Sequence, residues 1–133
     1  MDAKTRNRAN VRQGDAEQAV LVQWARLKQV KWPELVLLFA IPNGGYLAGN
    51  IGQRAAQAAR LKAGGMCKGV PDFCLPVARG GFHGLYIELK SGKGRATPDQ
   101  KWWIEALKEQ GYRAEVCQGW QAGTAVITEY MEE

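Results

Sequence analysis

Two short apolar segments with charges near one end constrain the fold of this 133-residue chain more than any other feature. They are "PDFCLPVA" (71–78) and "GLYIELK" (84–90), and two glycines at 80–81 provide the turn between them. Both have the length and residue types of β-strands, so they are predicted to form a hairpin. In a hairpin the start of the first strand and the end of the second meet at one edge of the sheet. This brings Asp72 close to Glu88.

The charges of this hairpin also share one face of the sheet. Side chains alternate along a strand, so Tyr86, Glu88 and Lys90 point to the same side. Two carboxylates a few ångströms apart repel, and Asp72 and Glu88 would not both stay ionised without a cation between them. Carboxylate oxygens with a main-chain carbonyl such as that of Leu89 suit a hard ion, Mg²⁺ or Mn²⁺. Lys90 would then orient a water or neutralise charge that develops on a phosphate.

The remaining segments predict helices and strands in alternation. Capping boxes or caps at Asp15, Asn50 and Thr97 each open a helix. The predicted helices run from Asp15 to Pro33, over 51–63, from Pro98 to Gly111 and over 120–133, and the further strands lie within 34–43 and over 112–118. The order α-β-α-β-β-α-β-α predicts an α/β fold with a mixed central sheet flanked by helices.

Chain length and composition indicate one domain over 15–133, preceded by a basic, flexible arm over 1–14. No apolar run approaches the ~20 residues of a membrane span, and the charged N-terminus lacks the apolar core of a secretory signal, so we expect a cytoplasmic protein. Three cysteines without a CxxC pair indicate reduced thiols. A zinc site from these and His83 is the alternative, but His83 has no partner at ligand spacing.

The net charge of +5 favours a polyanionic partner, and several basic or glycine-rich segments are candidates to contact it. The arm over 1–14 either contacts DNA or is a solvated tail, and the basic helix over 51–63 has the same two interpretations. The predicted DNA contacts are Asn43, Gly44, Gly45, Arg54, Arg60, Lys62, Lys93, Arg95 and Lys101.

Several short motifs resemble those of a known group of nucleases. The spacing from Pro71-Asp72 to Glu88-Leu89-Lys90 is similar to the PD-(D/E)xK nuclease superfamily. The chain further resembles the virus-type replication-repair nuclease (VRR-NUC) family through Glu17, "PNGG" at 42–45, "GVPDF" at 69–73, "ELK" at 88–90 and Gln100 in "TPDQ". This resemblance implies a restriction-endonuclease-like core.

The resemblance also implies a site, whose catalytic residues would be Glu17, Asp72, Glu88, Lys90 and Gln100. Asp72, Glu88 and the Leu89 carbonyl would bind the metal, and Glu17 would reach it through water. Each assignment has a structural alternative. Glu17 could satisfy a helix dipole, Gln100 could complete a capping box, and the other three could form an ion-pair network.

The function implied by the resemblance is Mg²⁺- or Mn²⁺-dependent hydrolysis of DNA phosphodiesters, with 5′-phosphate and 3′-hydroxyl products and no nucleotide cofactor. Small stand-alone family members occur in phages and bacteria and are similar to dimeric junction resolvases, so we expect a homodimer acting on junction, flap or nicked DNA in replication or repair. The alternatives are a non-catalytic nucleic-acid-binding protein, an RNA-binding module and a sequence-specific restriction-type endonuclease. The predicted dimer surface, with core packing as its alternative, comprises Trp120, Val126, Ile127, Tyr130 and Met131.

Overall fold

The structure is a computed structural model that describes residues 3–42 and 47–133. Its elements are α1 (Ala3–Lys28), a 3₁₀ helix η1 (Pro33–Leu37), β1 (Phe39–Ala40), α2 (Ile51–Ala63), β2 (Phe73–Leu75), β3 (Leu85–Lys90), α3 (Pro98–Glu109), β4 (Arg113–Gln118) and α4 (Gly119–Met131). The four strands form one sheet in the order β1-β2-β3-β4. β1 and β2 pair antiparallel, as do β2 and β3, whereas β3 and β4 run parallel. The predicted mixed α/β sheet is therefore confirmed.

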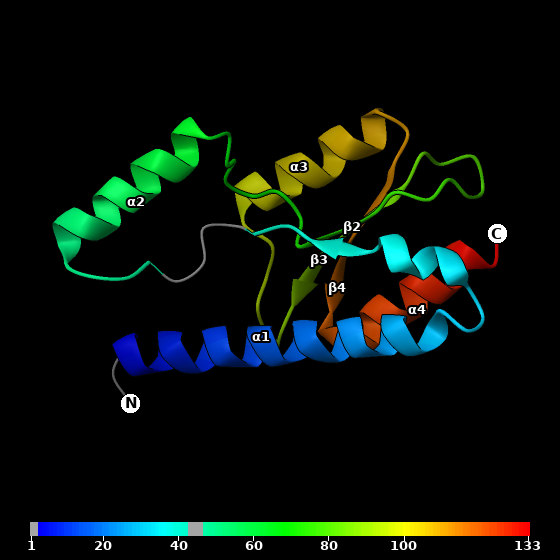
Figure 1. Ribbon diagram of the computed structural model, residues 1–133, viewed down its shortest axis with the longest axis horizontal. Coiled ribbons are helices and arrows are strands. Elements are labelled where there is room, and N and C mark those ends of the chain that lie inside the picture. The colour runs from blue at the N-terminus through cyan, green and yellow to red at the C-terminus, as the bar shows by residue number, and fades with distance from the viewer. Residues whose placement is uncertain (1–2, 43–46) are drawn as a thin grey trace.

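The sheet lies between two layers of helix (Figure 1). Helices α1 and α4 cover one face, where Leu21 of α1 and Ile127 of α4 join Leu85 and Ile87 of β3 in the buried core. Helix α3 packs on the other side against β4. Helix α2 buries none of its residues and projects away from the sheet (Figure 1). Because β3 and β4 run parallel, their carboxyl ends lie at the same end of the sheet, and β2 begins at that end.

The first helix is longer than predicted, because it begins at Ala3 and not at Asp15. Residues 3–14 are thus a continuation of α1, and the predicted boundary at residue 15 is not an element boundary. Ala, Lys, Arg and Gln dominate these residues and favour helix, whereas the single Gly14 costs only about 1 kcal/mol. Whether this segment contacts DNA stays a prediction.

The predicted strand within 34–43 is mostly wrong. Pro33 begins the 3₁₀ turn, where its fixed φ suits a helical first position, and only Phe39–Ala40 pair as a strand. The apolar run is also not a buried one: Leu35 is buried, but Val36, Leu37 and Phe39 are exposed. As an edge strand, β1 needs to bury only part of its surface.

The other predicted elements are present with small changes. The helix over 51–63 ends where predicted and opens with the Asn50–Gln53 capping box. The strand predicted over 71–78 shortens to Phe73–Leu75 because Pro76 has no amide hydrogen for the ladder. No helix among the described residues is long and apolar enough to span a bilayer.

The residues predicted for a dimer surface belong largely to the core. Ile127, Tyr130 and Met131 are buried, and the Tyr130 hydroxyl donates a hydrogen bond to the Val77 carbonyl. Trp120 and Val126 are partly buried against the same core, as are other residues of the α1–α4 layer. The core alternative is therefore correct for this helix, because its apolar stripe faces the sheet.

Candidate active site

The hairpin places two carboxylates opposite each other at the end of the sheet where β2 begins and β3 ends. Asp72 immediately precedes Phe73, which pairs with Ile87, so Asp72 lies across from Glu88. The main-chain N–H of Leu89 donates a hydrogen bond to Asp72 Oδ2 at 2.7 Å. This bond fixes the orientation of the Asp72 carboxylate relative to the end of β3.

Glu88 is the most deeply buried charged group in the described part of the chain. Its side chain is 3% exposed, and Lys90 Nζ lies 3.4 Å from its Oε1. The second oxygen, Oε2, is buried and has no hydrogen-bond partner among the residues that the structure describes. Buried polar atoms are almost always satisfied, so an oxygen left in this state is suited to receive a ligand.

The electrostatics of this pair oppose full ionisation. Burial, together with the neighbouring charge of Asp72, raises the pKa of Glu88 to about 7, against the opposing effect of Lys90. Burial also raises the pKa of Asp72, against the opposing effect of the Leu89 N–H and the Lys90 charge. A cation bound between the two carboxylates would favour the ionised form of both.

The donor set suits a hard divalent ion. Asp72 and Glu88 offer carboxylate oxygens, including the unsatisfied Oε2, and the Leu89 carbonyl is the expected third donor. No group of three or more His, Cys, Asp or Glu residues in the described ranges could hold a metal. The remaining ligands would have to be water or substrate oxygens, which is usual for Mg²⁺.

In the structure, Glu17 makes a contact at the amino end of α4. Its Oε2 accepts a hydrogen bond of 2.6 Å from the main-chain N–H of Trp120, in the first turn of α4. A carboxylate there satisfies a free amide and interacts favourably with the helix dipole. Glu17 does not form a common metal-binding group with Asp72 and Glu88. A contact to the metal through water stays a prediction.

Gln100 forms the contact of its structural alternative, and its catalytic role stays a prediction. Its Oε1 accepts a hydrogen bond of 2.9 Å from the N–H of Thr97, and its own N–H donates to Thr97 Oγ1. The two residues form the capping box that opens α3. Gln100 is half-buried, and its carbonyl oxygen is already used at the helix terminus.

A glycine holds the segment before Asp72 against α3. Gly69 has φ of +95°, and a Cβ there would lie 2.7 Å from the main-chain carbon of Asp99. Only glycine tolerates both the left-handed conformation and this approach. The Trp103 Nε1–H also donates to the Lys68 carbonyl at 3.1 Å, so α3 supports the loop that positions Asp72.

One contact at the site is not visible in the sequence pattern. Gln118, at the end of β4, pairs in register with Lys90, and its Nε2 donates to the Gly94 carbonyl at 2.7 Å. This bond holds the loop over 91–97, which carries the exposed Lys93 and Arg95, beside the end of β3. Only the parallel register of β3 and β4 would have identified Gln118.

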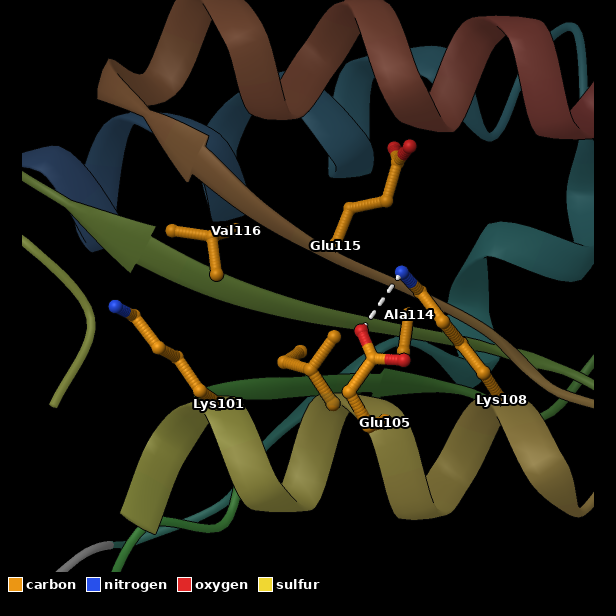
Figure 2. Close-up of a pocket in the computed structure, with 7 residues that line it drawn as sticks. Lys101, Glu105, Lys108, Ala114, Glu115 and Val116 are labelled. Carbon is orange, nitrogen blue, oxygen red and sulfur yellow. Dashed lines mark hydrogen bonds and ion pairs between the residues drawn. The ribbon is translucent and has the colours of Figure 1, made fainter. Parts of the chain in front are cut away.

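A shallow groove of about 340 Å³ lies between α3 and β4 (Figure 2). Val116 on its floor pairs with Glu88 in the sheet, and Lys101 extends from α3 toward the same end (Figure 2). The groove is not uniformly basic, because Lys108 is paired with Glu105 at 3.3 Å. Lys101 lies in the groove at the end where Val116 pairs with Glu88, and its contact with DNA stays a prediction.

The other predicted DNA contacts divide into two groups. Arg54, Arg60 and Lys62 are exposed on α2, outside the layer that holds the carboxylates. Asn43, Gly44 and Gly45 lie outside the described residues. Contacts between any of these residues and DNA stay predictions.

Comparisons with known proteins identify a related family over most of the chain. A sequence model of the VRR-NUC domain matches residues 12–121. A solved structure described as a VRR_NUC domain protein is similar at 33% sequence identity and a TM-score of 0.73, covering 90% of this chain and 88% of the other. No curated protein matches the chain at a significant level.

Proposed function

The chain belongs to the VRR-NUC domain family, and on this premise we propose that it is a divalent-metal-dependent deoxyribonuclease. The family is nuclease-like, and the substrate proposed here is DNA with a junction, flap or nick. The cofactor would be Mg²⁺ or Mn²⁺. The products would carry 5′-phosphate and 3′-hydroxyl ends.

The observation that carries this proposal is the unsatisfied carboxylate oxygen of Glu88. This oxygen, Oε2, is buried beside Asp72, which itself accepts a hydrogen bond from the Leu89 N–H. The other oxygen of Glu88, Oε1, lies 3.4 Å from the Lys90 ammonium. A structural ion-pair network would leave both Glu88 oxygens paired, because an unsatisfied buried acceptor costs about 1–3 kcal/mol. The arrangement therefore supports a site that holds a cation.

Each residue would make a distinct contribution to hydrolysis. Asp72 and Glu88 would bind the ion, which when present lowers the pKa of water and offsets charge on the phosphate. Lys90 would donate to the attacking water or to a phosphate oxygen, because its ammonium lies 3.4 Å from Glu88 and is largely shielded from solvent. Lys93 and Arg95, on the loop held by Gln118, would bind the flanking phosphates.

The preference for branched or nicked DNA follows from what the chain offers for recognition. Its exposed cations, on α2 and on the loop over 91–97, suit contacts with phosphates. Such contacts recognise the path of the backbone and favour structure over sequence. A homodimer would present two sites to two strands, as resolution of a junction requires.

A panel of labelled DNAs tests the activity: linear, nicked, flap and four-way forms, each with Mg²⁺, Mn²⁺ or EDTA. We expect cleavage of at least one branched or nicked form with a metal, and none with EDTA. Cleavage of linear duplex at one sequence would indicate a restriction-type enzyme. Tight binding with no cleavage in either metal would indicate a non-catalytic binding protein.

Light scattering at micromolar protein tests the dimer separately. A dimer would have a mass near 29 kDa, about twice the 14.7 kDa of the chain. A species of 14.7 kDa that cleaves four-way junctions would exclude the dimer as a requirement.

A further inference from the structure

An exposed aromatic side chain lies on the same face of the sheet as the carboxylates. Phe39 of β1 pairs with Cys74 of β2, which in turn pairs with Tyr86 of β3. Residues paired across antiparallel strands point to the same side, so Phe39, Cys74 and Tyr86 share one face of the sheet. Leu38 packs against the core on the opposite side, as alternation requires.

The next row along this face contains the proposed metal ligands. The N–H of Ile41 donates to the Asp72 carbonyl at 2.7 Å, so Ile41 lies across from Asp72, and Asp72 lies across from Glu88. Phe39 is therefore the diagonal neighbour of Asp72. Such neighbours have Cα atoms about 7–8 Å apart, within reach of an aromatic side chain.

Phe39 remains exposed because α3, the helix on this face, covers the edge of the sheet that is farthest from β1. α3 packs against β4, and β1 is the opposite edge strand. The Phe39 side chain is consequently 50% exposed, whereas Phe73 on the neighbouring strand is buried. A half-exposed phenylalanine beside a site is free to contact a ligand there.

We infer that Phe39 stacks on an unpaired nucleobase next to the scissile phosphate, an assignment that rests on the proposed nuclease function. A phosphate held by the proposed metal at Asp72 and Glu88 would carry its base at a distance comparable to the roughly 7–8 Å between the Cα atoms of Asp72 and Phe39. The ring has no hydrogen-bonding atoms, so it accepts any base. Bases inside an intact duplex present no free face. A flap leaves bases unpaired at its branch, so Phe39 would favour flap DNA at the site itself.

The test is a binding cycle between Phe39 and the base. Wild type, Phe39→Ala and Phe39→Trp are titrated against flap DNA by fluorescence anisotropy, with Ca²⁺ in place of Mg²⁺. Matched flaps carry a single abasic site at each of the four nucleotides around the branch. Stacking on one base is worth roughly tenfold in affinity. We expect Phe39→Ala to weaken binding of the intact flap by about this factor, and one abasic position to weaken binding of wild type equally. Phe39→Ala should then bind that abasic flap no more weakly than either change alone predicts, because both changes remove the same contact.

Two variants separate stacking from general effects. Val36→Ala removes an apolar side chain that is 65% exposed on η1, and it should bind the intact flap as wild type does. Phe39→Trp should retain the discrimination between intact and abasic DNA. Thermal melting of each variant checks the fold, which should be preserved because Phe39 lies on an edge strand.

The outcomes distinguish this inference from the proposed function. Equal affinity of wild type and Phe39→Ala for every DNA, or additive losses at all abasic positions, would overturn the stacking role while leaving hydrolysis intact. Coupled losses without cleavage of any DNA in Mg²⁺ or Mn²⁺ would support stacking and refute the nuclease. A wild type that binds none of the DNAs would refute both.

Discussion

Each end of the β3–β4 pair has a basic side chain next to carboxylates, but the two ends differ in how deeply the acids are buried. At the carboxyl end, Lys90 is 3.4 Å from Glu88, and Asp72 lies opposite. At the amino end, the guanidinium of Arg113 pairs with three carboxylates at 3.3–3.5 Å, those of Glu115, Glu129 and Glu133.

The difference lies in the burial of the acids. The carboxylates around Arg113 are 34–65% exposed, whereas Glu88 is 3% exposed. Burial disfavours the Arg113 cation, but the surrounding carboxylates outweigh it and raise the pKa of Arg113. At the other end burial dominates and raises the pKa of Glu88 to about 7.

This contrast separates a structural cluster from the proposed metal site. The Arg113 cluster joins β4 to α4, and each of its charges is matched or hydrated. The Asp72–Glu88 pair keeps a buried oxygen unsatisfied and two like charges together. Such an arrangement costs stability, and the proposed cation would relieve this cost on binding.

The largest expected effect comes from removing a carboxylate at the buried end. Asp72→Ala or Glu88→Ala should reduce cleavage by more than the ~10²–10³-fold that loss of one electrostatic donor costs, because each removes a metal ligand. DNA binding should survive or tighten, since repulsion of the phosphate falls. Glu129→Ala at the Arg113 cluster is the matched control and should cleave as wild type does. Cleavage within about tenfold of wild type in both site variants would refute the metal site.

Lys90→Ala should have the next largest effect, and on turnover alone. Loss of one electrostatic donor typically lowers the rate ~10²–10³-fold, whereas Mn²⁺ affinity measured by calorimetry should remain, because the ammonium is not a ligand. Arg113→Ala is the corresponding change at the other end and should lower stability without changing turnover of the folded protein. If Lys90→Ala loses its Mn²⁺ affinity, Lys90 instead organises the ligands.

The hairpin could be predicted from the sequence because its signals are local. Alternation in β3 and the glycine turn determine the face and the edge on which Asp72, Glu88 and Lys90 lie. The caps at Asn50 and Thr97 were visible for the same reason, since each needs a partner only three residues away.

The remaining contacts of the site depend on tertiary pairing that no local pattern encodes. Glu17 bonds to Trp120, 103 residues along the chain, and Gln118 reaches Gly94 only through the register of β4. The apolar run over 34–41 predicted a buried strand, but Pro33 begins a 3₁₀ turn and the position at the sheet edge leaves Phe39 exposed. Periodicity reports which face is apolar and not whether another element covers it.

The smallest expected effect is a pH-dependent change in stability, which should come from Glu88 at the carboxyl end of β3 and not from the Arg113 cluster. The pKa of Glu88 rises from an ordinary 4.5 to about 7 on folding, so the folded protein binds the proton more tightly than the unfolded chain. Stability from this group is therefore full below pH 4.5 and is lost as the pH rises to 7. Urea denaturation in EDTA should give a free energy of unfolding about 2 kcal/mol lower at pH 8 than at pH 5.5.

Glu88→Gln sharpens this test because the amide keeps the shape of the side chain and cannot ionise. This variant should be more stable than wild type at pH 8 and should lose most of the pH dependence, and Mg²⁺ should raise the stability of wild type only. The exposed Glu129 gives the control: Glu129→Gln should change stability by less than about 0.5 kcal/mol at either pH, as expected for a solvated ion pair. A Glu88→Gln protein less stable than wild type at pH 8 would mean that the Lys90 pair stabilises the fold. Both ends of the β3–β4 pair would then carry ion pairs that stabilise the fold, and these would differ only in strength.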